Sequence, residues 1–257
     1  MNSHHSKGAS AVLVRRISVM QTGLALIQEP WLYWERISGL SGCGSIYKGP
    51  LVKAPRACIA VKGMDVILVL KFCSRDLTVI KVRLRVESGE RLGVAFASAY
   101  FPDDADGSPP AREVEILIQY CQKSKILLLL GCDASSHHSV WGITNINDRG
   151  RDLIEYLAVT DMEILNRGDT PICQVKNRSE VFDLTLCSER LRSRVVDWRV
   201  SNEESLSDHK YIPFQLNLGK PVVSKVKNPR NTLWDSYKEE LRGRLVEFLK
   251  NYDSIDE

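Results

Sequence analysis

The chain contains 257 residues, of which 44% are hydrophobic and 26% are charged. This length and composition can bury a substantial core, as one large domain with an appendage or as two small domains, and we favour one. The formal net charge of +3 excludes a strongly basic, histone-like binder. Any contact with nucleic acid must therefore use local basic patches.

The seven cysteines are odd in number and irregularly spaced, and several lie in apolar runs. This usage is typical of a reducing compartment, and neither a CxxC pair nor a zinc-type spacing occurs. Residues 1–10 are polar, unlike a secretory signal. The longest apolar runs, such as 126–130, fall far short of the roughly 20 residues that span a bilayer. We expect a soluble intracellular protein without a membrane span.

The first hundred residues predict one helix followed mainly by strands. Residues 11–20 have the apolar spacing of a short amphipathic helix, and residues 24–28 form an apolar strand that ends at Glu29. Glycines and a proline between 39 and 50 predict a loop. Four β-like segments follow, at 57–61, 66–73, 77–86 and 92–101, and the third alternates apolar with basic residues, as expected of a strand with one solvated face.

The remainder of the chain mixes helices and strands. A Pro- and Asp-rich loop at 102–110 precedes a predicted helix at 112–121 and a continuous aliphatic run at 125–132, which is typical of a strand buried on both faces. We predict a further helix at 151–159 and strands at 162–165, 181–187, 195–200 and 211–218. Strands outnumber helices and often follow one another directly, so the sequence predicts an α+β sandwich rather than a parallel βαβ sheet.

Acidic and imidazole side chains lie at or near strand ends in four places, at Glu29, Asp133, Asp183 and the pair Asp208-His209. A single acid there is more often a cap or turn residue, but several could converge on one cleft. Carboxylates suit Mg²⁺, and a histidine paired with an aspartate suits acid–base or transition-state duty. Together they predict metal-assisted phosphodiester hydrolysis.

Five local motifs carry a family resemblance. They are LIQEPW at 26–31, SAYFP at 98–102, GCDASSHH at 131–138 with Trp141-Gly142, DLTL at 183–186 and SDH at 207–209. Their order and spacing resemble the endonuclease/exonuclease/phosphatase superfamily, and most of all the apurinic-endonuclease-like domains of R1- and Jockey-type non-LTR retrotransposons. The resemblance covers roughly residues 2–218.

The resemblance implies a four-layer α/β sandwich of two mixed β-sheets flanked by helices, lacking its first strand, over residues 1–218. Residues 219–231 are then a basic linker, and 232–257 are the helical start of a region that leads, in a full-length parent, toward a reverse transcriptase domain. The implied partner is DNA, with no membrane, and the implied location is nuclear. The implied cofactor is Mg²⁺ or Mn²⁺.

The resemblance also assigns roles by position. It implies that Glu29 is the main metal ligand and that Asp208 lies near the metal or the phosphate. His209, oriented by Asp183, would contact the phosphate or act as a base. The remaining roles are a hydrogen bond from Tyr100 to the phosphate, positioning or deprotonation of the attacking water by Asp133, and a metal-site asparagine at Asn2.

One position departs from the family motif Asp-x-Asn, because Ser135 stands where asparagine is expected. A serine hydroxyl is shorter than an amide and offers a single donor. Loss of one preorganised donor typically costs about 10²–10³ in rate. Three readings therefore stay open: a Mg²⁺-dependent DNA nickase of reduced activity, an inactive DNA-binding relic, and a phosphatase of the same superfamily.

Two further features need a structural test. Pro213 interrupts a predicted strand, which only an edge or a bulge tolerates. The pair His137-His138 is predicted to shape a loop near DNA rather than to bind a metal, because adjacent side chains of an extended segment point apart.

Overall fold

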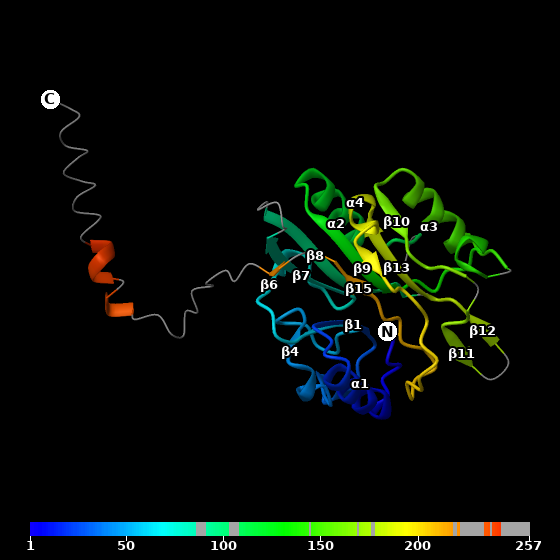
Figure 1. Cartoon of the computed structure of the whole chain (residues 1–257), viewed down its shortest axis with the longest axis horizontal. Coiled ribbons are helices and arrows are strands. Elements are labelled where there is room, and N and C mark those ends of the chain that lie inside the picture. The colour runs from blue at the N-terminus through cyan, green and yellow to red at the C-terminus, as the bar shows by residue number, and fades with distance from the viewer. Residues whose placement is uncertain are drawn as a thin grey trace. The chain divides into compact units, whose positions relative to one another are not determined.

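Two β-sheets lie face to face between helices in residues 1–222 (Figure 1). The smaller sheet has the order β1-β5-β4 and is antiparallel throughout, with β1 at Leu24–Gln28, β5 at Ala57–Val61 and β4 at Ser45–Tyr47. Asn2 adds a single parallel bridge to Gln28 at its edge. The computed structural model describes residues 1–85, 91–102, 108–143, 145–168, 170–175, 178–217, 220–221, 234–236 and 238–242.

The larger sheet has the order β10-β13-β9-β8-β7-β16, with β6 pairing to β7 off this path. The β8–β9 pair is parallel, and every other pair in this sheet is antiparallel, so the sheet is mixed. Its strands are β6 (Ile67–Leu68), β7 (Leu77–Arg85), β8 (Arg91–Tyr100), β9 (Leu127–Asp133), β10 (Met162–Ile164), β13 (Asp183–Ser188) and β16 (Lys220–Pro221).

Four helices and three 3-10 turns accompany the sheets. The helices are α1 (Lys7–Val19), α2 (Arg112–Lys123), α3 (Asp148–Ala158) and α4 (Glu189–Arg192), and the turns are η1 (Ser41–Cys43), η2 (Leu70–Phe72) and η3 (Ser139–Trp141). Three short hairpins or ladders complete the described part: β2 (Leu32–Tyr33) with β3 (Arg36–Ile37), β11 (Cys173–Val175) with β12 (Arg178–Glu180), and β14 (Val195–Val196) with β15 (Gln215–Leu216).

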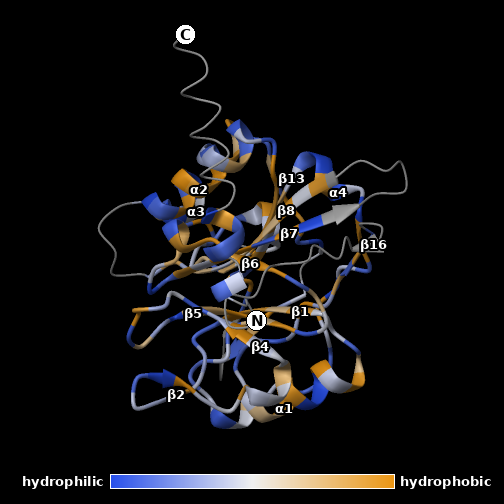
Figure 2. Cartoon of the chain, turned by 90° about the vertical axis from the view of Figure 1, so that its left-hand side faces the viewer, coloured by the Kyte–Doolittle hydropathy of each residue, from blue (hydrophilic) through white to orange (hydrophobic). Residues whose placement is uncertain are grey.

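In Figure 2 the sheets lie between α1 below and α2 and α3 above. Buried apolar side chains divide among three core clusters. Leu13 and Ile17 of α1 pack on the outer face of the small sheet. Side chains such as Leu26 and Phe96 fill the space between the sheets. Leu117 of α2 and Leu153 of α3 cover the far face of the large sheet. The predicted four-layer sandwich of two sheets flanked by helices is confirmed.

Local sequence explains the helices. In α2 the buried residues recur at a spacing of three or four, which turns one face toward the sheet, and two acids in its first turn favour the positive end of the helix dipole. In α1 the Ser6 side chain accepts the Ala9 N–H as an N-cap, and in α3 the Asn147 side chain accepts the Gly150 N–H in the same way.

The predicted strands at 24–28 and 57–61 are confirmed at both ends. The predicted strand at 66–73 is wrong, because only Ile67–Leu68 pair and the chain then turns into η2. The strands expected at 195–200 and 211–218 shrink to two residues each. Pro213 lies before β15, and its carbonyl oxygen accepts the Arg199 N–H, so it interrupts no ladder.

The chain divides into two units, Met1–Val222 and Val223–Glu257. Two residues of the expected basic linker, Lys220 and Pro221, pair with β7. Residues 234–236 and 238–242 of the second unit are helical, and the rest of the expected helix lies outside the described residues. Within the described parts, no helix combines the length and the apolar composition needed to cross a membrane.

Candidate active site

Strand register brings the acidic motifs to one edge of the large sheet. Asp133, the last residue of β9, pairs with Asp183, the first residue of the antiparallel β13. Tyr100, the last residue of β8, pairs with Asp133 in the parallel β8–β9 ladder. Three side chains from distant motifs therefore share one sheet edge because three strands begin or end there.

Asn2 connects this edge to the small sheet. Its side-chain Nδ2 donates to Asp133 Oδ2 at 2.7 Å and to Glu29 Oε2 at 2.9 Å. Asn2 is buried, and its Oδ1 accepts the backbone N–H of His4 at 2.7 Å. One amide thus uses both of its donors and its acceptor, and it fixes two carboxylates at a set separation.

Gln28 links the strands next to the site by hydrogen bonds. Its side-chain Nε2 donates to Ser98 Oγ at 2.9 Å and to the Gly131 carbonyl at 3.0 Å. Ser98 Oγ in turn donates to the carbonyl of Ile27 at 2.9 Å. These buried bonds cross from β1 to β8 and β9, so they align the strand that precedes Glu29 with the strand that ends at Asp133.

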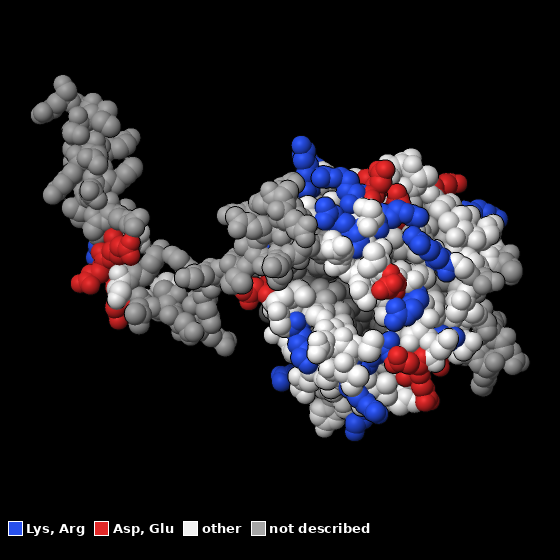
Figure 3. Space-filling model, in the orientation of Figure 1, with Lys and Arg blue, Asp and Glu red and all other residues white. Residues whose placement is uncertain are grey.

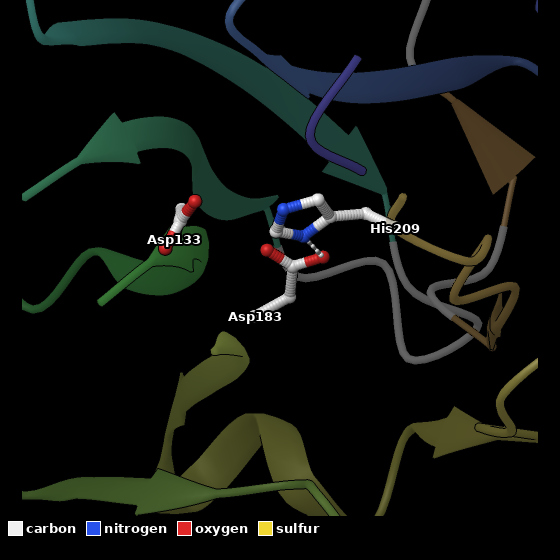
Figure 4. Close-up of side chains that lie close together, drawn as sticks. All are labelled: Asp133, Asp183 and His209. Carbon is white, nitrogen blue, oxygen red and sulfur yellow. Dashed lines mark hydrogen bonds and ion pairs between the residues drawn. The ribbon is translucent and has the colours of Figure 1, made fainter. Parts of the chain in front are cut away.

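His209 and Asp183 form a buried ion pair, with His209 Nδ1 3.0 Å from Asp183 Oδ2 (Figure 4). The other ring nitrogen points toward the side on which Asp133 lies. Burial alone would lower the pKa of His209, but the Asp183 carboxylate outweighs it and raises that pKa to about 11. In this arrangement the imidazole is a cation at neutral pH, held in one orientation.

At Asp133, burial is the main influence on the pKa. Burial, and then the nearby charge of Asp183, raise the pKa of Asp133 to about 6, although His209 and the Asn2 hydrogen bond lower it. A carboxyl group that titrates close to neutral pH can both accept and release a proton, which suits general base catalysis.

Ser135 lies against Asp133 rather than apart from it. Its backbone N–H donates to Asp133 Oδ1 at 3.2 Å, and its Oγ lies 3.5 Å from the same oxygen. The φ angle of Ser135 is +44°, in the left-handed region that asparagine tolerates better than serine does. The backbone therefore retains a conformation that suits the asparagine of the family motif, while the side chain lacks the amide.

The N-terminal segment borders the site with two histidines. His4 Nδ1 lies 2.8 Å from Asp208 Oδ2, and both side chains are exposed. His5 Nε2 lies 3.5 Å from Glu29 Oε1. Glu29, His4 and His5 all have positive φ angles, of 45°, 45° and 53°. Such backbone strain is maintained only where the surrounding structure overdetermines it, and it concentrates at functional sites.

The ring of Tyr100 packs against an arginine side chain. The Arg56 guanidinium lies over the Tyr100 ring at 4.8 Å from its centroid, and Arg56 Nε and Nη2 contact the two carboxylate oxygens of Asp76 at 2.5 and 2.6 Å. The backbone repeats the link, because Glu29 N–H donates to the Arg56 carbonyl and Tyr100 N–H donates to the Asp76 carbonyl.

Comparisons with known proteins bear on the family and the fold. A family model described as endonuclease-reverse transcriptase matches residues 94–213. The endonuclease domain of TRAS1, a telomere-specific non-LTR retrotransposon, is 26% identical, with a TM-score of 0.72 over 86% of this chain and 97% of that one. No curated protein matches the sequence.

Two further solved structures share the fold at low identity. The catalytic domain of Xenopus laevis APE2 is 8% identical, with a TM-score of 0.59 over 88% of this chain and 93% of that one. An AP endonuclease from Archaeoglobus fulgidus is 13% identical, with a TM-score of 0.58 over 84% and 97%. The chain is therefore similar to the retrotransposon endonuclease domains of the endonuclease/exonuclease/phosphatase superfamily.

Nucleases of this superfamily generally depend on divalent metal ions, and the described residues offer suitable donors. Ligand atoms of Asp133, Asp183 and His209 lie within 4.8 Å of one another. Asp183 Oδ1 is a buried oxygen without a hydrogen-bond partner among the described residues, as expected of an atom that a bound ion or water satisfies. Glu29, with Asn2 beside it, offers hard oxygen ligands that suit Mg²⁺ or Mn²⁺.

The structure brings several of the predicted site residues together at the sheet edge, beside others that were not predicted. Asn2, Glu29 and Asp133 are joined by hydrogen bonds, and Asp183 and His209 adjoin Asp133. Asp208 is more exposed and contacts His4 at the rim of the site. Sequence reasoning gave no role to Gln28, Arg56, Asp76, His4 or His5. Only the histidines had a signal, since they lie within three residues of Asn2.

The paired histidines and two tryptophans lie in different environments. His137 Nε2 contacts Glu180 Oε2 at 2.8 Å and the His138 ring packs near Trp141, so the two rings have separate partners. Trp141 is buried, and its Nε1 donates to the carbonyl of Ser136, which makes it a core residue beneath the loop that follows Asp133. Trp34 is 80% exposed.

Proposed function

We propose that this domain is a divalent-metal-dependent DNA endonuclease that nicks one strand, with a rate reduced by Ser135. The observation that carries the proposal is the connection of Glu29 to Asp133 through the Asn2 amide, beside the buried His209–Asp183 pair. A carboxylate available to a cation, a carboxyl that titrates near neutral pH and an oriented imidazolium are the parts that phosphodiester hydrolysis requires.

Each side chain has a separate task in the reaction. Asp133 positions the attacking water and accepts its proton, consistent with its pKa near 6. His209 is held by Asp183 through Nδ1, so Nε2 donates to the phosphate and stabilises the charge that develops there. Because the raised pKa keeps this imidazole protonated, we favour the phosphate-stabilising role of His209 over that of a base. Tyr100 donates a further hydrogen bond to the phosphate.

The carboxylate of Glu29 would hold the divalent cation, with Asn2 and Asp208 beside it, and the cation when bound supplies Lewis-acid stabilisation of the phosphate. We favour Glu29 over the Asp133–Asp183–His209 group as the main ligand. A protonated imidazole whose Nδ1 is committed to Asp183 cannot ligate a metal without losing its proton.

DNA would approach by local patches, since the net charge is small. Figure 3 shows basic side chains over the upper part of the visible face, but Arg190 and Arg192 of α4 follow the end of β13 opposite to Asp183, so this patch lies away from the site. In a full-length parent, nicking would prepare DNA for a downstream reverse transcriptase domain, which implies a nuclear site of action.

A second function, a DNA-binding module without turnover, is favoured by one observation. Ser135 Oγ lies 3.5 Å from Asp133 Oδ1, so the hydroxyl faces the carboxylate, where an amide would also reach the phosphate. In this reading the site binds DNA and the missing donor prevents cleavage. The two functions differ only in turnover.

A plasmid-nicking assay with Mg²⁺ tests the proposal, using the native domain, Ser135→Asn and Asp133→Asn. We expect slow nicking by the native domain, about 10²–10³-fold faster nicking by Ser135→Asn, and none by Asp133→Asn. Fluorescence anisotropy on a DNA duplex measures binding for all three proteins. Binding is expected to be similar, because position 135 changes a transition-state contact.

Three outcomes distinguish the readings. Nicking by Ser135→Asn alone would favour the binding module for the native domain. Hydrolysis of a small phosphate monoester without cleavage of DNA would favour a phosphatase. No nicking by either the native domain or Ser135→Asn, with DNA binding intact, would overturn the proposed endonuclease.

A further inference from the structure

His5 has a fixed tautomer. Its Nδ1 lies 3.0 Å from the carbonyl oxygen of Pro30, and a carbonyl oxygen only accepts, so Nδ1 carries the hydrogen. In the neutral ring the lone pair is therefore on Nε2. A backbone carbonyl that holds one ring nitrogen in this way is the usual support for a histidine that ligates a metal through the other.

The two carboxylate oxygens of Glu29 face different residues. Oε2 accepts the Asn2 amide at 2.9 Å, whereas Oε1 faces His5 Nε2 at 3.5 Å. A good hydrogen bond between nitrogen and oxygen spans about 2.7–3.2 Å, so the Oε1–Nε2 separation is longer than one. When the ring is neutral, two electron-rich atoms face each other, an arrangement that a shared cation stabilises.

The backbone holds these two atoms in place. His5 N–H donates to the Glu29 carbonyl at 2.9 Å, and both residues have left-handed φ angles. The Glu29 side chain is 16% exposed and the His5 side chain 45%, so the gap between them is accessible from solvent. The strained backbone of both residues brings a nitrogen and an oxygen ligand to the same point.

We propose that His5 Nε2 and Glu29 Oε1 form a mixed nitrogen and oxygen ligand pair, which gives this site a preference for a first-row transition ion over Mg²⁺. The inference rests on the proposed function, because it extends the cation site at Glu29. Imidazole binds first-row transition ions well, whereas Mg²⁺ prefers oxygen ligands and retains its water. His4 differs from His5, because its Nδ1 makes an ordinary 2.8 Å contact to Asp208.

Mn²⁺ is the probe, since it accepts oxygen ligands and its pulsed electron paramagnetic resonance spectrum reports a directly bound nitrogen. We compare the native domain with His5→Asn and with His4→Asn as a matched control. Asparagine suits both positions because it tolerates a positive φ. His5→Gly is a second variant of the same position that accepts this backbone. Calorimetry measures the affinities for Mn²⁺ and Mg²⁺.

We expect the native domain and His4→Asn to show nitrogen coupling to bound Mn²⁺, and both His5 variants to lose it. The His5 variants should bind Mn²⁺ at least about tenfold more weakly while their Mg²⁺ affinity changes little. Absence of coupling in the native domain, or its persistence in a folded His5 variant, would overturn the inference. Coupling that persists in His5→Asn but vanishes in His209→Asn would move the cation to the Asp133–Asp183–His209 group.

The inference and the proposed function fail differently. If Glu29→Gln binds both ions as tightly as the native domain does, the cation site at Glu29 is wrong and the inference fails with it. If nitrogen coupling depends on His5 but no variant nicks plasmid DNA, the ligand pair stands and the endonuclease proposal fails.

Discussion

The Asn2 side chain donates a 2.7 Å hydrogen bond to Asp133 Oδ2, although 131 positions separate the two residues in the chain. The same Nδ2 donates to Glu29, so one amide spans the two sheets at the site. The three residues form a unit whose members depend on each other, because each buried carboxylate oxygen would otherwise lack this donor.

Replacing Asn2 with alanine should therefore reduce both stability and activity. We expect a loss of about 1–3 kcal/mol in the free energy of unfolding, since two carboxylates lose a donor, and a further rise in the pKa of Asp133. Urea unfolding and plasmid nicking check this. Asn147→Ala, which removes the α3 cap, should cost about 1 kcal/mol and leave the pH profile of nicking unchanged. Equal pH profiles for both variants would contradict the role of Asn2.

Asp133 should make stability fall and activity rise over the same pH range. Its pKa in the folded domain is raised from 3.8 to about 6, so the folded state holds the proton more tightly than the unfolded state does. The free energy of unfolding contributed by Asp133 is present below about pH 4 and is lost as the pH rises through about 6. Urea unfolding with a chelator present measures the free energy of unfolding of the native domain and of Asp133→Asn. The value for the native domain minus that for the variant should decrease as the pH rises from about 4 to about 6.

The nicking rate has the opposite dependence, because the proton acceptor is the ionised carboxylate. We expect the logarithm of the nicking rate of Ser135→Asn to rise with pH at unit slope up to about pH 6 and then to level off. A rate that is flat from pH 4.5 to 7 would exclude Asp133 as the base.

Replacing Arg56 should reduce both the stability of the domain and its nicking rate. Arg56→Met removes both bonds to Asp76, leaving a largely buried carboxylate, and removes the charge above the Tyr100 ring. We expect a loss of about 1–3 kcal/mol in the free energy of unfolding and slower nicking. Arg56→Lys should recover only part of this, since an ammonium cannot bind bidentately. Arg112→Met, which breaks an exposed pair with Glu115, should change stability by less than about 0.5 kcal/mol.

Gly150 should tolerate no side chain, although it lies in the first turn of α3. A Cβ there would approach the backbone oxygen of His137 to 1.9 Å, which displaces the loop that follows Asp133. Gly150→Ala should therefore destabilise the domain by more than about 2 kcal/mol, against the gain of about 1 kcal/mol that alanine usually brings to a helix. Gly63→Ala, where nothing lies within 4 Å but φ is +73°, should cost only about 1 kcal/mol. Thermal unfolding compares the two variants.

The sequence by itself determined the strands built from short continuous apolar runs and the order of the motifs. Leu24–Gln28 and Ala57–Val61 have the predicted bounds because continuous apolar runs leave little choice of conformation. The residues Glu29, Asp133, Asp183 and His209 were found because each follows, begins or borders such a run. The segment 66–73 was misassigned because its apolar residues pack on the core as a 3-10 turn, which periodicity over a few residues cannot separate from a strand.

Only the tertiary structure decided how these residues act together. The pairing of β9 with β13 sets Asp133 opposite Asp183, and burial there raises one pKa while the ion pair raises that of His209. The bridging role of Asn2, the support from Gln28 and the alignment of His5 with Glu29 depend on contacts between residues far apart in sequence. Local pattern does not encode such distances, because strand register and the packing of one sheet on the other fix them.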